Sequence, residues 1–249
     1  MTETELSVYY PEDYWGDNGA PDEDWIRKSQ AEKVTFLRRC SSQQGRLLDV
    51  GCGSGFFLRA VESSKWERWG VETGERAATA AAGALGKSKV VQGTLIEAAF
   101  PESYFDAICF WSALEHMNDP RANLVEARRI VKPGGTLVVQ VPNAASYQLR
   151  LFKGKWFALD APRHRYHFDP STLKRLLRDA GFEVYMESFF SKSHNSHALR
   201  QSLKTRLRAK DSVIGYAAFC LSIPLIKPID FLISAAGSGA TLTVAAKAI

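Results

Sequence analysis

One short segment of the chain combines an acidic side chain with three closely spaced glycines. Residues 47–55 read LLDVGCGSG. The apolar residues before Asp49 suit a buried strand, and the glycines permit positive φ and close approach of a ligand to bare backbone. Asp49 then lies where the strand ends, and it can accept hydrogen bonds from loop amides or from the ligand itself. The pattern therefore predicts a site for a small polar cofactor.

A second acid follows at the spacing such a site requires. Residues 66–72 read as the next strand, and Glu72 lies at its carboxyl end. This position is about 20 residues beyond the first glycine, where a ribose-binding acid is expected. A carboxylate accepts two hydrogen bonds side by side, as a ribose diol needs. The alternative is a solvated glutamate at the end of a strand.

The glycine spacing distinguishes between two classes of nucleotide site. The dinucleotide fingerprint requires a third glycine three residues after the second, and Phe56 occupies that position. The observed spacing is G-x-G-x-G. A nicotinamide-dependent oxidoreductase is therefore disfavoured.

These residues need a frame of strands to hold them at one edge. Short apolar segments alternate with helical ones, which indicates right-handed β-α-β units and a parallel sheet. After the first two strands, further strands are predicted at residues 89–94, 105–111 and 136–141. Leu95 follows the third of these strands, where it could cover one face of an adenine.

Four motifs in order resemble one known family. LDVGCGSG, FDAI, LEH and KPGG are similar to the motifs of class I S-adenosylmethionine (SAM) methyltransferases, a resemblance that covers about residues 30 to 190. It implies an α/β, Rossmann-like, seven-stranded sheet, mostly parallel with an antiparallel last strand, and helices on both faces. Residues 182–190 and 240–248 would supply strands six and seven. SAM would be the methyl donor, and S-adenosylhomocysteine the product.

The cofactor-binding residues follow from the loop, the strand ends and this resemblance. Trp111, just past strand four, would lie near the methionine part of the cofactor, with packing in the core as the alternative. The full predicted set is Asp49, Gly51, Gly53, Gly55, Glu72, Thr94, Leu95 and Trp111.

Candidate bases lie in a segment inserted after strand five. Residues 156–168 carry His164 and His167, and they follow the carboxyl end of a strand, where ligands bind in open α/β sheets. Either imidazole could take a proton from the acceptor at neutral pH. His116, within LEH, is a further candidate, and hydrogen bonding within the loop is the alternative role. No metal-ligand spacing is found in the sequence.

Length and composition indicate one domain with additions. The chain has 249 residues with 45% hydrophobic content, enough for one large core. Residues 1–29 are interpreted as an N-terminal arm or lid, and residues 30–249 as the SAM-binding domain. Within that domain, residues 144–170 form an inserted loop and residues 194–234 a basic and apolar helical insertion. The four cysteines show no paired spacing and no secretory signal begins the chain, which predicts a cytoplasmic protein.

The second insertion joins a basic stretch to an apolar one. Leu199, Leu203 and Leu207 recur every fourth residue, which predicts a helix with cations around its other faces. The apolar run at residues 213–226 is interrupted by Pro224, and it is predicted to be too short to span a bilayer. We expect peripheral contact with the inner membrane face. A helical cap on the sheet and an oligomer interface are the alternatives.

The expected function is transfer of a methyl group from SAM to a small-molecule, lipid-linked or saccharide acceptor, at oxygen. The alternative is a non-catalytic SAM-fold scaffold that docks through its C-terminal region. The overall charge of +5 also raises the question of nucleic acid. No RNA-binding appendage or long basic tail accompanies it, so a nucleic-acid partner is not expected.

Overall fold

One mixed seven-stranded sheet organises the chain in the computed structural model, which describes residues 22–41, 44–191, 194–207 and 212–249. The strands are β1 (Gly45–Val50), β2 (Trp66–Glu72), β3 (Val90–Gln92), β4 (Phe105–Trp111), β5 (Val131–Pro142), β6 (Phe182–Ser188) and β7 (Thr241–Ala248).

The strand order across the sheet is β3-β2-β1-β4-β5-β7-β6. Strands β1 to β5 pair in parallel, whereas β7 pairs antiparallel with both β5 and β6. The carboxyl ends of β1, β2 and β4 therefore meet at one edge. The predicted Rossmann-like sheet is confirmed, including its antiparallel last strand.

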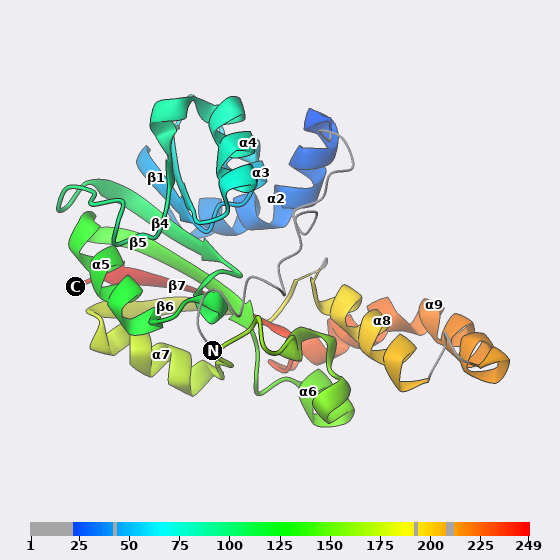
Figure 1. The fold of residues 1–249 in the computed structure, drawn as a ribbon. Coiled ribbons are helices and arrows are strands. Elements are labelled where there is room, and N and C mark those ends of the chain that lie inside the picture. The colour runs from blue at the N-terminus through cyan, green and yellow to red at the C-terminus, as the bar shows by residue number, and fades with distance from the viewer. Residues whose placement is uncertain (1–21, 42–43, 192–193, 208–211) are drawn as a thin grey trace.

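Helices cover both faces of this sheet, as predicted (Figure 1). The α-helices are α2 (Glu23–Cys40), α3 (Phe56–Ala60), α4 (Glu75–Leu85), α5 (Pro120–Ile130), α6 (Tyr147–Phe152), α7 (Pro170–Asp179), α8 (His194–Arg206) and α9 (Val213–Ala235), and short 3-10 turns lie at η1 (Lys87–Lys89), η2 (Leu114–His116), η3 (Lys153–Lys155) and η4 (Phe157–Leu159).

Successive strand residues supply the two halves of the core because side chains alternate across a strand. Leu47 joins the cluster under α2, α3 and α4, whereas Leu48 joins the cluster under α5 and α7. Both leucines are fully buried. The strand that carries Asp49 therefore packs against helices on both faces of the sheet.

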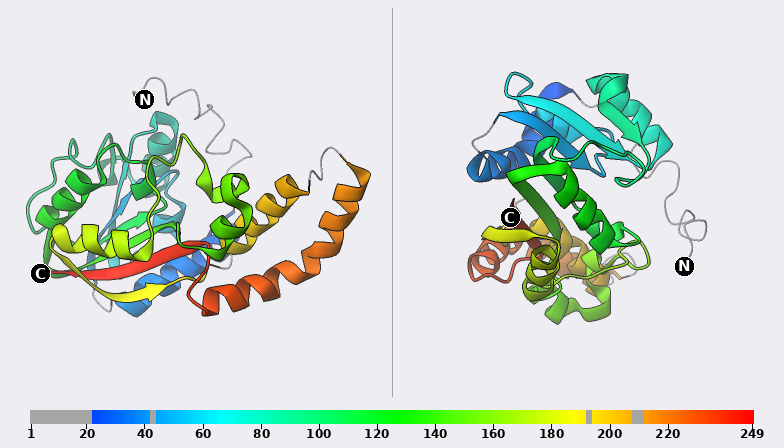
Figure 2. Two further views of the ribbon diagram at one scale, coloured as in Figure 1. Left: turned by 90° about the horizontal axis from the view of Figure 1, so that it is seen from below. Right: turned by 90° about the vertical axis from the view of Figure 1, so that its left-hand side faces the viewer.

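Helices α8 and α9 extend away from the sheet as an arm (Figure 2). A separate apolar cluster joins the arm to the loop after β5. Its buried members include Trp156, Leu199 and Ile226.

The structure of the arm formed by α8 and α9 corrects one prediction. The apolar segment was expected to break at Pro224, but α9 runs unbroken for 23 residues through both Pro224 and Pro228. Residues 214–235 of α9 are long and apolar enough to cross a membrane by length and composition. The prediction that this apolar segment is too short to span a bilayer was therefore wrong.

One strand boundary differs from that predicted, and two of the predicted segments contain helices. Strand β5 begins at Val131, before the predicted start at residue 136, and so includes the KPGG segment. The inserted loop at residues 144–170 contains α6 and two 3-10 turns. The predicted N-terminal arm or lid, residues 1–29, is described only in part. Residues 1–21 lie outside the described residues, and residues 23–29 form the start of α2.

Candidate functional site

The glycine loop adopts the backbone conformation that its residues permit. Gly51, Gly53 and Gly55 have φ values of 72°, 53° and 77°, in the left-handed region that disfavours other residues. A Cβ at Gly51 would also lie 2.8 Å from Cβ of Ala113. The loop between β1 and α3 therefore presents backbone with little side chain over it, and it lies against the end of β4.

Glu72 holds this loop from the end of the neighbouring strand. Its side chain is 4% exposed. Oε2 accepts the backbone N–H of Gly53, and Oε1 accepts that of Gly74, each at 2.8 Å. Each carboxylate oxygen has two acceptor positions, so capacity for a ligand diol remains beside the loop.

Asp49 is the second buried acid of the site. It is 2% exposed, and its Oδ1 has no hydrogen-bond partner among the described residues. Burial raises the pKa of Asp49 to about 7, an effect that nearby Lys33 opposes and Glu72 increases. A buried acceptor of this kind, beside bare loop amides, fits a polar cofactor such as the one the sequence predicted.

Lys33 belongs to the site although sequence reasoning missed it. Helix α2 brings this half-buried lysine close enough to Asp49 to lower the carboxyl pKa. Its Nζ lies 5.6 Å from the centre of the Trp111 ring, within the range of a cation–π contact. Nothing in the local sequence distinguishes Lys33 from the other cations of its helix.

The remaining predicted cofactor residues lie around this edge in different settings. Trp111 is 6% exposed and packs edge-on against Phe57, with ring centroids 5.2 Å apart. Leu95 is 1% exposed within the core. The Thr94 hydroxyl donates to the Glu97 carboxylate at 2.8 Å. Their contacts with a cofactor stay predictions.

The structure brings the three predicted histidines together. The rings of His116 and His164 lie 4.7 Å apart, and those of His164 and His167 lie 6.3 Å apart. Each ring forms a hydrogen bond with a backbone carbonyl oxygen. Nδ1 of His116 bonds the carbonyl of Arg163 at 3.1 Å, and Nδ1 of His164 bonds the carbonyl of Ala158 at 2.9 Å. Nε2 of His167 bonds the carbonyl of Leu159 at 2.8 Å. The loop hydrogen bonding weighed as an alternative role is therefore present for all three.

Two of these histidines are held in the neutral form. Burial first, and then the charge that His164 would carry, lower the pKa of His116 to about 4. Burial also lowers the pKa of His164, while its bond to Ala158 and the charge of Asp160 oppose that effect. Both imidazoles are therefore uncharged at neutral pH, and each has one ring nitrogen with a lone pair.

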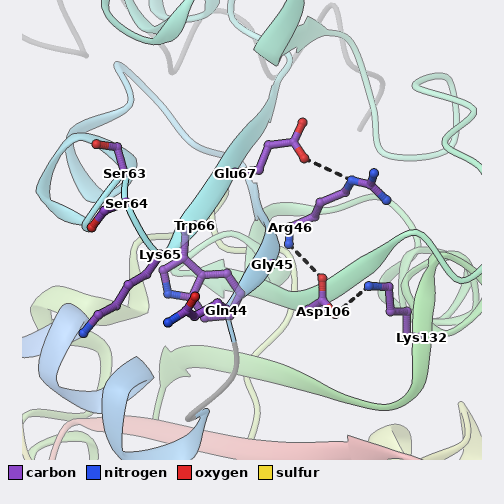
Figure 3. Close-up of a pocket in the computed structure, with 10 residues that line it drawn as sticks. All are labelled: Gln44, Gly45, Arg46, Ser63, Ser64, Lys65, Trp66, Glu67, Asp106 and Lys132. Carbon is purple, nitrogen blue, oxygen red and sulfur yellow. Dashed lines mark hydrogen bonds and ion pairs between the residues drawn. The ribbon is translucent and has the colours of Figure 1, made fainter.

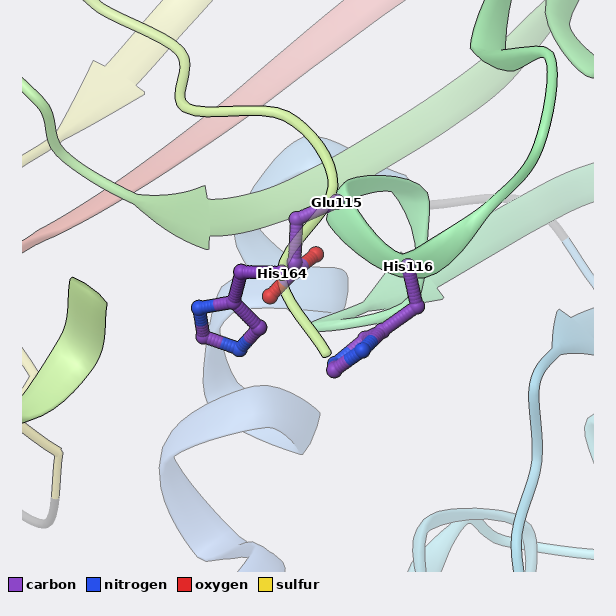
Figure 4. A group of neighbouring side chains, drawn as sticks. All are labelled: Glu115, His116 and His164. Carbon is purple, nitrogen blue, oxygen red and sulfur yellow. The ribbon is translucent and has the colours of Figure 1, made fainter. Parts of the chain in front are cut away.

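Glu115, beside His116, is a site residue that the sequence analysis left without a role. It is fully buried, and burial raises the pKa of its carboxyl to about 8. With His116 and His164 it forms a group of three metal-capable side chains (Figure 4). The sequence search missed this group because its members come from segments about 50 residues apart.

A pocket of about 670 Å³ lies at the opposite edge of the sheet (Figure 3). It is lined by the starts of β1, β2 and β4, among them Arg46, Glu67 and Asp106. Its charges pair with one another: Arg46 Nε donates to Glu67 at 3.1 Å, and Lys132 Nζ donates to Asp106 at 2.6 Å. This pocket is far from the glycine loop and is not the predicted cofactor site.

Comparison with known proteins agrees with this geometry. A protein family described as "Methyltransferase domain" matches residues 24–187. A Mycolicibacterium smegmatis protein named "Probable S-adenosylmethionine-dependent methyltransferase" is 24% identical over 160 residues, which are 64% of this chain and 60% of that protein. The ubiquinone/menaquinone biosynthesis C-methyltransferase UbiE of Burkholderia vietnamiensis is 30% identical over 181 residues, covering 62% of this chain and 74% of UbiE.

Solved structures share the fold. A SAM-dependent methyltransferase from Archaeoglobus fulgidus superposes with a TM-score of 0.60 at 22% identity, covering 97% of this chain and 99% of that one. A geranyl diphosphate C-methyltransferase from Streptomyces coelicolor superposes with a TM-score of 0.58 at 15% identity, covering 94% and 87%.

Proposed function

This chain belongs to the class I SAM-dependent methyltransferase family, and on that premise we propose that it methylates an oxygen of a lipid-linked acceptor at an anionic membrane surface. The observation that carries the catalytic part is the bare glycine loop, which buried Glu72 holds and which lies against Ala113 in the segment after β4 that carries His116. The protruding apolar helix α9 supports the membrane part.

The residues at the carboxyl ends of β1 and β2 would hold the cofactor. Glu72 would accept hydrogen bonds from its ribose, and the loop from Gly51 to Gly55 would lie against its polar chain. Buried Asp49 would accept a donor group that water cannot reach. Bound there, SAM supplies an electrophilic methyl group and a good leaving group.

The chain's own contribution to the reaction is orientation and proton removal. His116 and His164 are neutral at pH 7. His116 lies in the turn after β4, whose Ala113 approaches Gly51 of the glycine loop, and the ring of His164 packs against that of His116 from the loop before α7. A neutral imidazole there would take the proton of an acceptor hydroxyl as the new bond forms. Alignment of the two reactants can contribute as much as about 7 to 11 kcal/mol.

The lipid-linked acceptor is favoured by the composition of α9. Lys227 and Asp230 are the only charged residues among its 23, and a helix that is apolar all round is normally buried in protein or in membrane. Here Ile214, Leu221 and Leu232 are 83%, 79% and 67% exposed. A membrane would remove these side chains from water.

Helix α8 adds cations beside the apolar surface of α9, and these cations favour an anionic membrane. Arg200 and Arg206 are exposed and Lys204 is half-buried, and α8 packs beside α9. Cations next to an inserted apolar surface favour anionic headgroups by about 1 kcal/mol each. This charge preference supports the proposal that the protein acts at the inner, cytoplasmic face of a membrane.

The test combines catalysis and location. The full-length protein is incubated with methyl-tritiated SAM and either a total membrane lipid extract or the water-soluble small molecules of the same cells. We expect label in the lipid fraction. We also expect the protein to co-sediment with phosphatidylglycerol vesicles and to bind phosphatidylcholine vesicles less.

Matched variants separate the surface from the fold. Leu221→Ser with Leu232→Ser should reduce vesicle binding at least tenfold, because two exposed apolar side chains lose their favourable transfer. Ile96→Ser with Val125→Ser removes two exposed apolar residues from the body of the protein, and it should leave vesicle binding unchanged. Label only in water-soluble products would refute a lipid-linked acceptor, and SAM binding with no labelled product would favour a scaffold.

Carbon is the second candidate for the methylated atom, favoured by the similarity to a C-methyltransferase. Hydriodic acid cleaves methyl ethers but leaves carbon-bound methyl groups in place. Release of the label as methyl iodide would support oxygen, and its retention would identify carbon.

A further inference from the structure

Two segments far apart in the sequence meet around one buried carboxylate. Glu115 and His116 lie in η2, directly after β4, and His164 lies in the loop that precedes α7 (Figure 4). One ligand atom from each of the three side chains lies within 4.8 Å of the others. The backbone ties the segments together, because the carbonyl oxygen of Glu115 accepts the N–H groups of Arg165 and Tyr166 at 2.9 and 3.2 Å.

Glu115 is the side chain that requires a partner. It is 0% exposed, and neither Oε1 nor Oε2 has a hydrogen-bond partner among the described residues. An uncompensated buried carboxylate is costly, and proteins resolve that cost by protonation, by pairing or by metal coordination. Within the described part of the chain, no cation makes an ion pair with Glu115.

The two histidines are oriented as metal ligands are. A carbonyl oxygen can only accept, so the bonds to Arg163 and Ala158 place the ring hydrogens of His116 and His164 on Nδ1. That tautomer leaves Nε2 as the nitrogen with the lone pair. An Nδ1–H bonded to a backbone carbonyl is the usual outer support of a coordinating histidine.

We propose that Glu115, His116 and His164 bind one divalent transition-metal ion through a carboxylate oxygen and two Nε2 atoms. Two imidazoles and one carboxylate suit zinc, iron, cobalt or manganese better than magnesium or calcium, which prefer oxygen ligands. Bonds of about 2.1 Å place tetrahedral donors about 3.4 Å apart, so small side-chain rotations would close the site. Asp160, whose Oδ2 lies 3.8 Å from Nε2 of His164, lies beside the site and pairs with Arg163 at 2.6 Å.

Such an ion would deepen the proposed function, and its role there rests on that function. Three protein ligands leave coordination positions for an acceptor oxygen. A bound hydroxyl loses its proton more easily, so the ion would take the place of His116 and His164 as the activator of the acceptor, and the released proton would pass to solvent. The existence of the site can be tested without any acceptor.

The experiment uses the full-length protein, stripped of metal with a chelator and titrated with Co²⁺ and Zn²⁺ without SAM. We expect one Co²⁺ per chain, a visible d–d absorption typical of four or five ligands, and displacement by Zn²⁺. Glu115→Gln keeps the shape but removes the charge, and it should weaken Co²⁺ binding at least tenfold. His164→Asn should do the same.

The same Co²⁺ titration is applied to two control variants. His197→Asn and Glu102→Gln remove an exposed imidazole and an exposed carboxylate outside the cluster, and both should bind Co²⁺ as the wild type does. Absence of stoichiometric Co²⁺ binding by folded wild-type protein would overturn the proposal, even if a variant failed to fold. Equal binding by wild type, Glu115→Gln and His164→Asn would also overturn it.

Calorimetry with SAM on the same sample separates the two proposals. If SAM binds but Co²⁺ does not, only the metal site fails. If Co²⁺ binds to the cluster but SAM does not bind, the proposed methyl transfer fails and the metal site stands.

Discussion

Asp49 is a buried carboxyl group whose ionisation changes the free energy of folding. Its pKa is about 7 in the folded protein, against an ordinary value of 3.8, mainly because burial disfavours the charged form. A raised pKa means that the folded state binds a proton that the unfolded state releases. The resulting stabilisation is fully present below about pH 4 and is lost as the pH rises through 7.

We therefore expect Asp49→Asn to reduce the pH dependence of stability. Between pH 4 and pH 8 the free energy of unfolding of the wild type should fall by up to about 4 kcal/mol more than that of the variant. Urea denaturation at several pH values measures the difference, with Asp179→Asn, an exposed carboxylate at the end of α7, as the control. Parallel pH profiles for wild type and Asp49→Asn would contradict this account of the site.

Sequence predicted those site residues whose type and spacing carry the signal. Asp49 and Glu72 lie at the ends of apolar strands, so their position could be predicted from short segments. Lys33 and Glu115 could not be assigned, because their roles depend on contacts between elements distant in the chain. A lysine on an amphipathic helix and a glutamate in a turn are usually solvated, and only the packing of α2 and of the 157–168 loop shows otherwise.

At the scale of elements, Asn195 joins the arm to the sheet. It is 0% exposed, and its Nδ2 donates to the carbonyl oxygen of Phe189 at 2.8 Å and to Oγ of Ser234 at 2.9 Å. These bonds connect the end of β6 with α8 and with the last turn of α9. A buried polar group left without partners costs about 1 to 3 kcal/mol.

Asn195→Ala should therefore loosen the arm before the sheet. We expect hydrogen–deuterium exchange to quicken about 5- to 100-fold across residues 213–235, the range that a loss of about 1 to 3 kcal/mol permits. Protection of β4 and β5 should stay as in the wild type. Arg200→Ala, an exposed change on the same helix, is the control. Uniform loss of protection across the whole chain would show that the arm is not a separate unit of stability.

Helix α9 shows where element prediction from sequence fails. The strands could be predicted because each is a short apolar segment bounded by turn residues, and the four motifs identified their sequence along the chain. Proline was expected to end the helix because it lacks a donor. Pro224 and Pro228 are both exposed, so they do not disturb the face of α9 on which Ile226 packs with Leu199 of α8. Tertiary packing outweighed local propensity.

At the scale of the whole molecule, ligand contacts are expected in two places with different chemistry. The carboxyl edge of the sheet offers bare amides and buried carboxylates, whereas the arm offers an apolar surface beside cations. The proposed function uses both, since the acceptor would approach from the membrane while the cofactor comes from water. Binding at the sheet edge should then stabilise the fold whether or not a membrane is present.

That expectation can be measured through linkage between binding and unfolding. SAM at about 100 times its Kd should add about 2.7 kcal/mol to the free energy of unfolding, which for a chain of 249 residues raises Tm by about 5 to 10 °C. NAD at the same concentration should leave Tm unchanged, because Phe56 stands where the dinucleotide loop needs glycine.

Glu72→Gln identifies the residue responsible for this stabilisation. The variant loses charge-assisted hydrogen bonds worth about 1 to 3 kcal/mol of SAM affinity, so at the same SAM concentration its rise in Tm should be between about two thirds and one tenth of that of the wild type. Glu75→Gln changes an exposed carboxylate in the next turn of chain, and it should respond to SAM as the wild type does. A full rise in Tm for Glu72→Gln would mean that Glu72 serves only to hold the amides of Gly53 and Gly74. The ribose would then have to be bound by other groups at this edge.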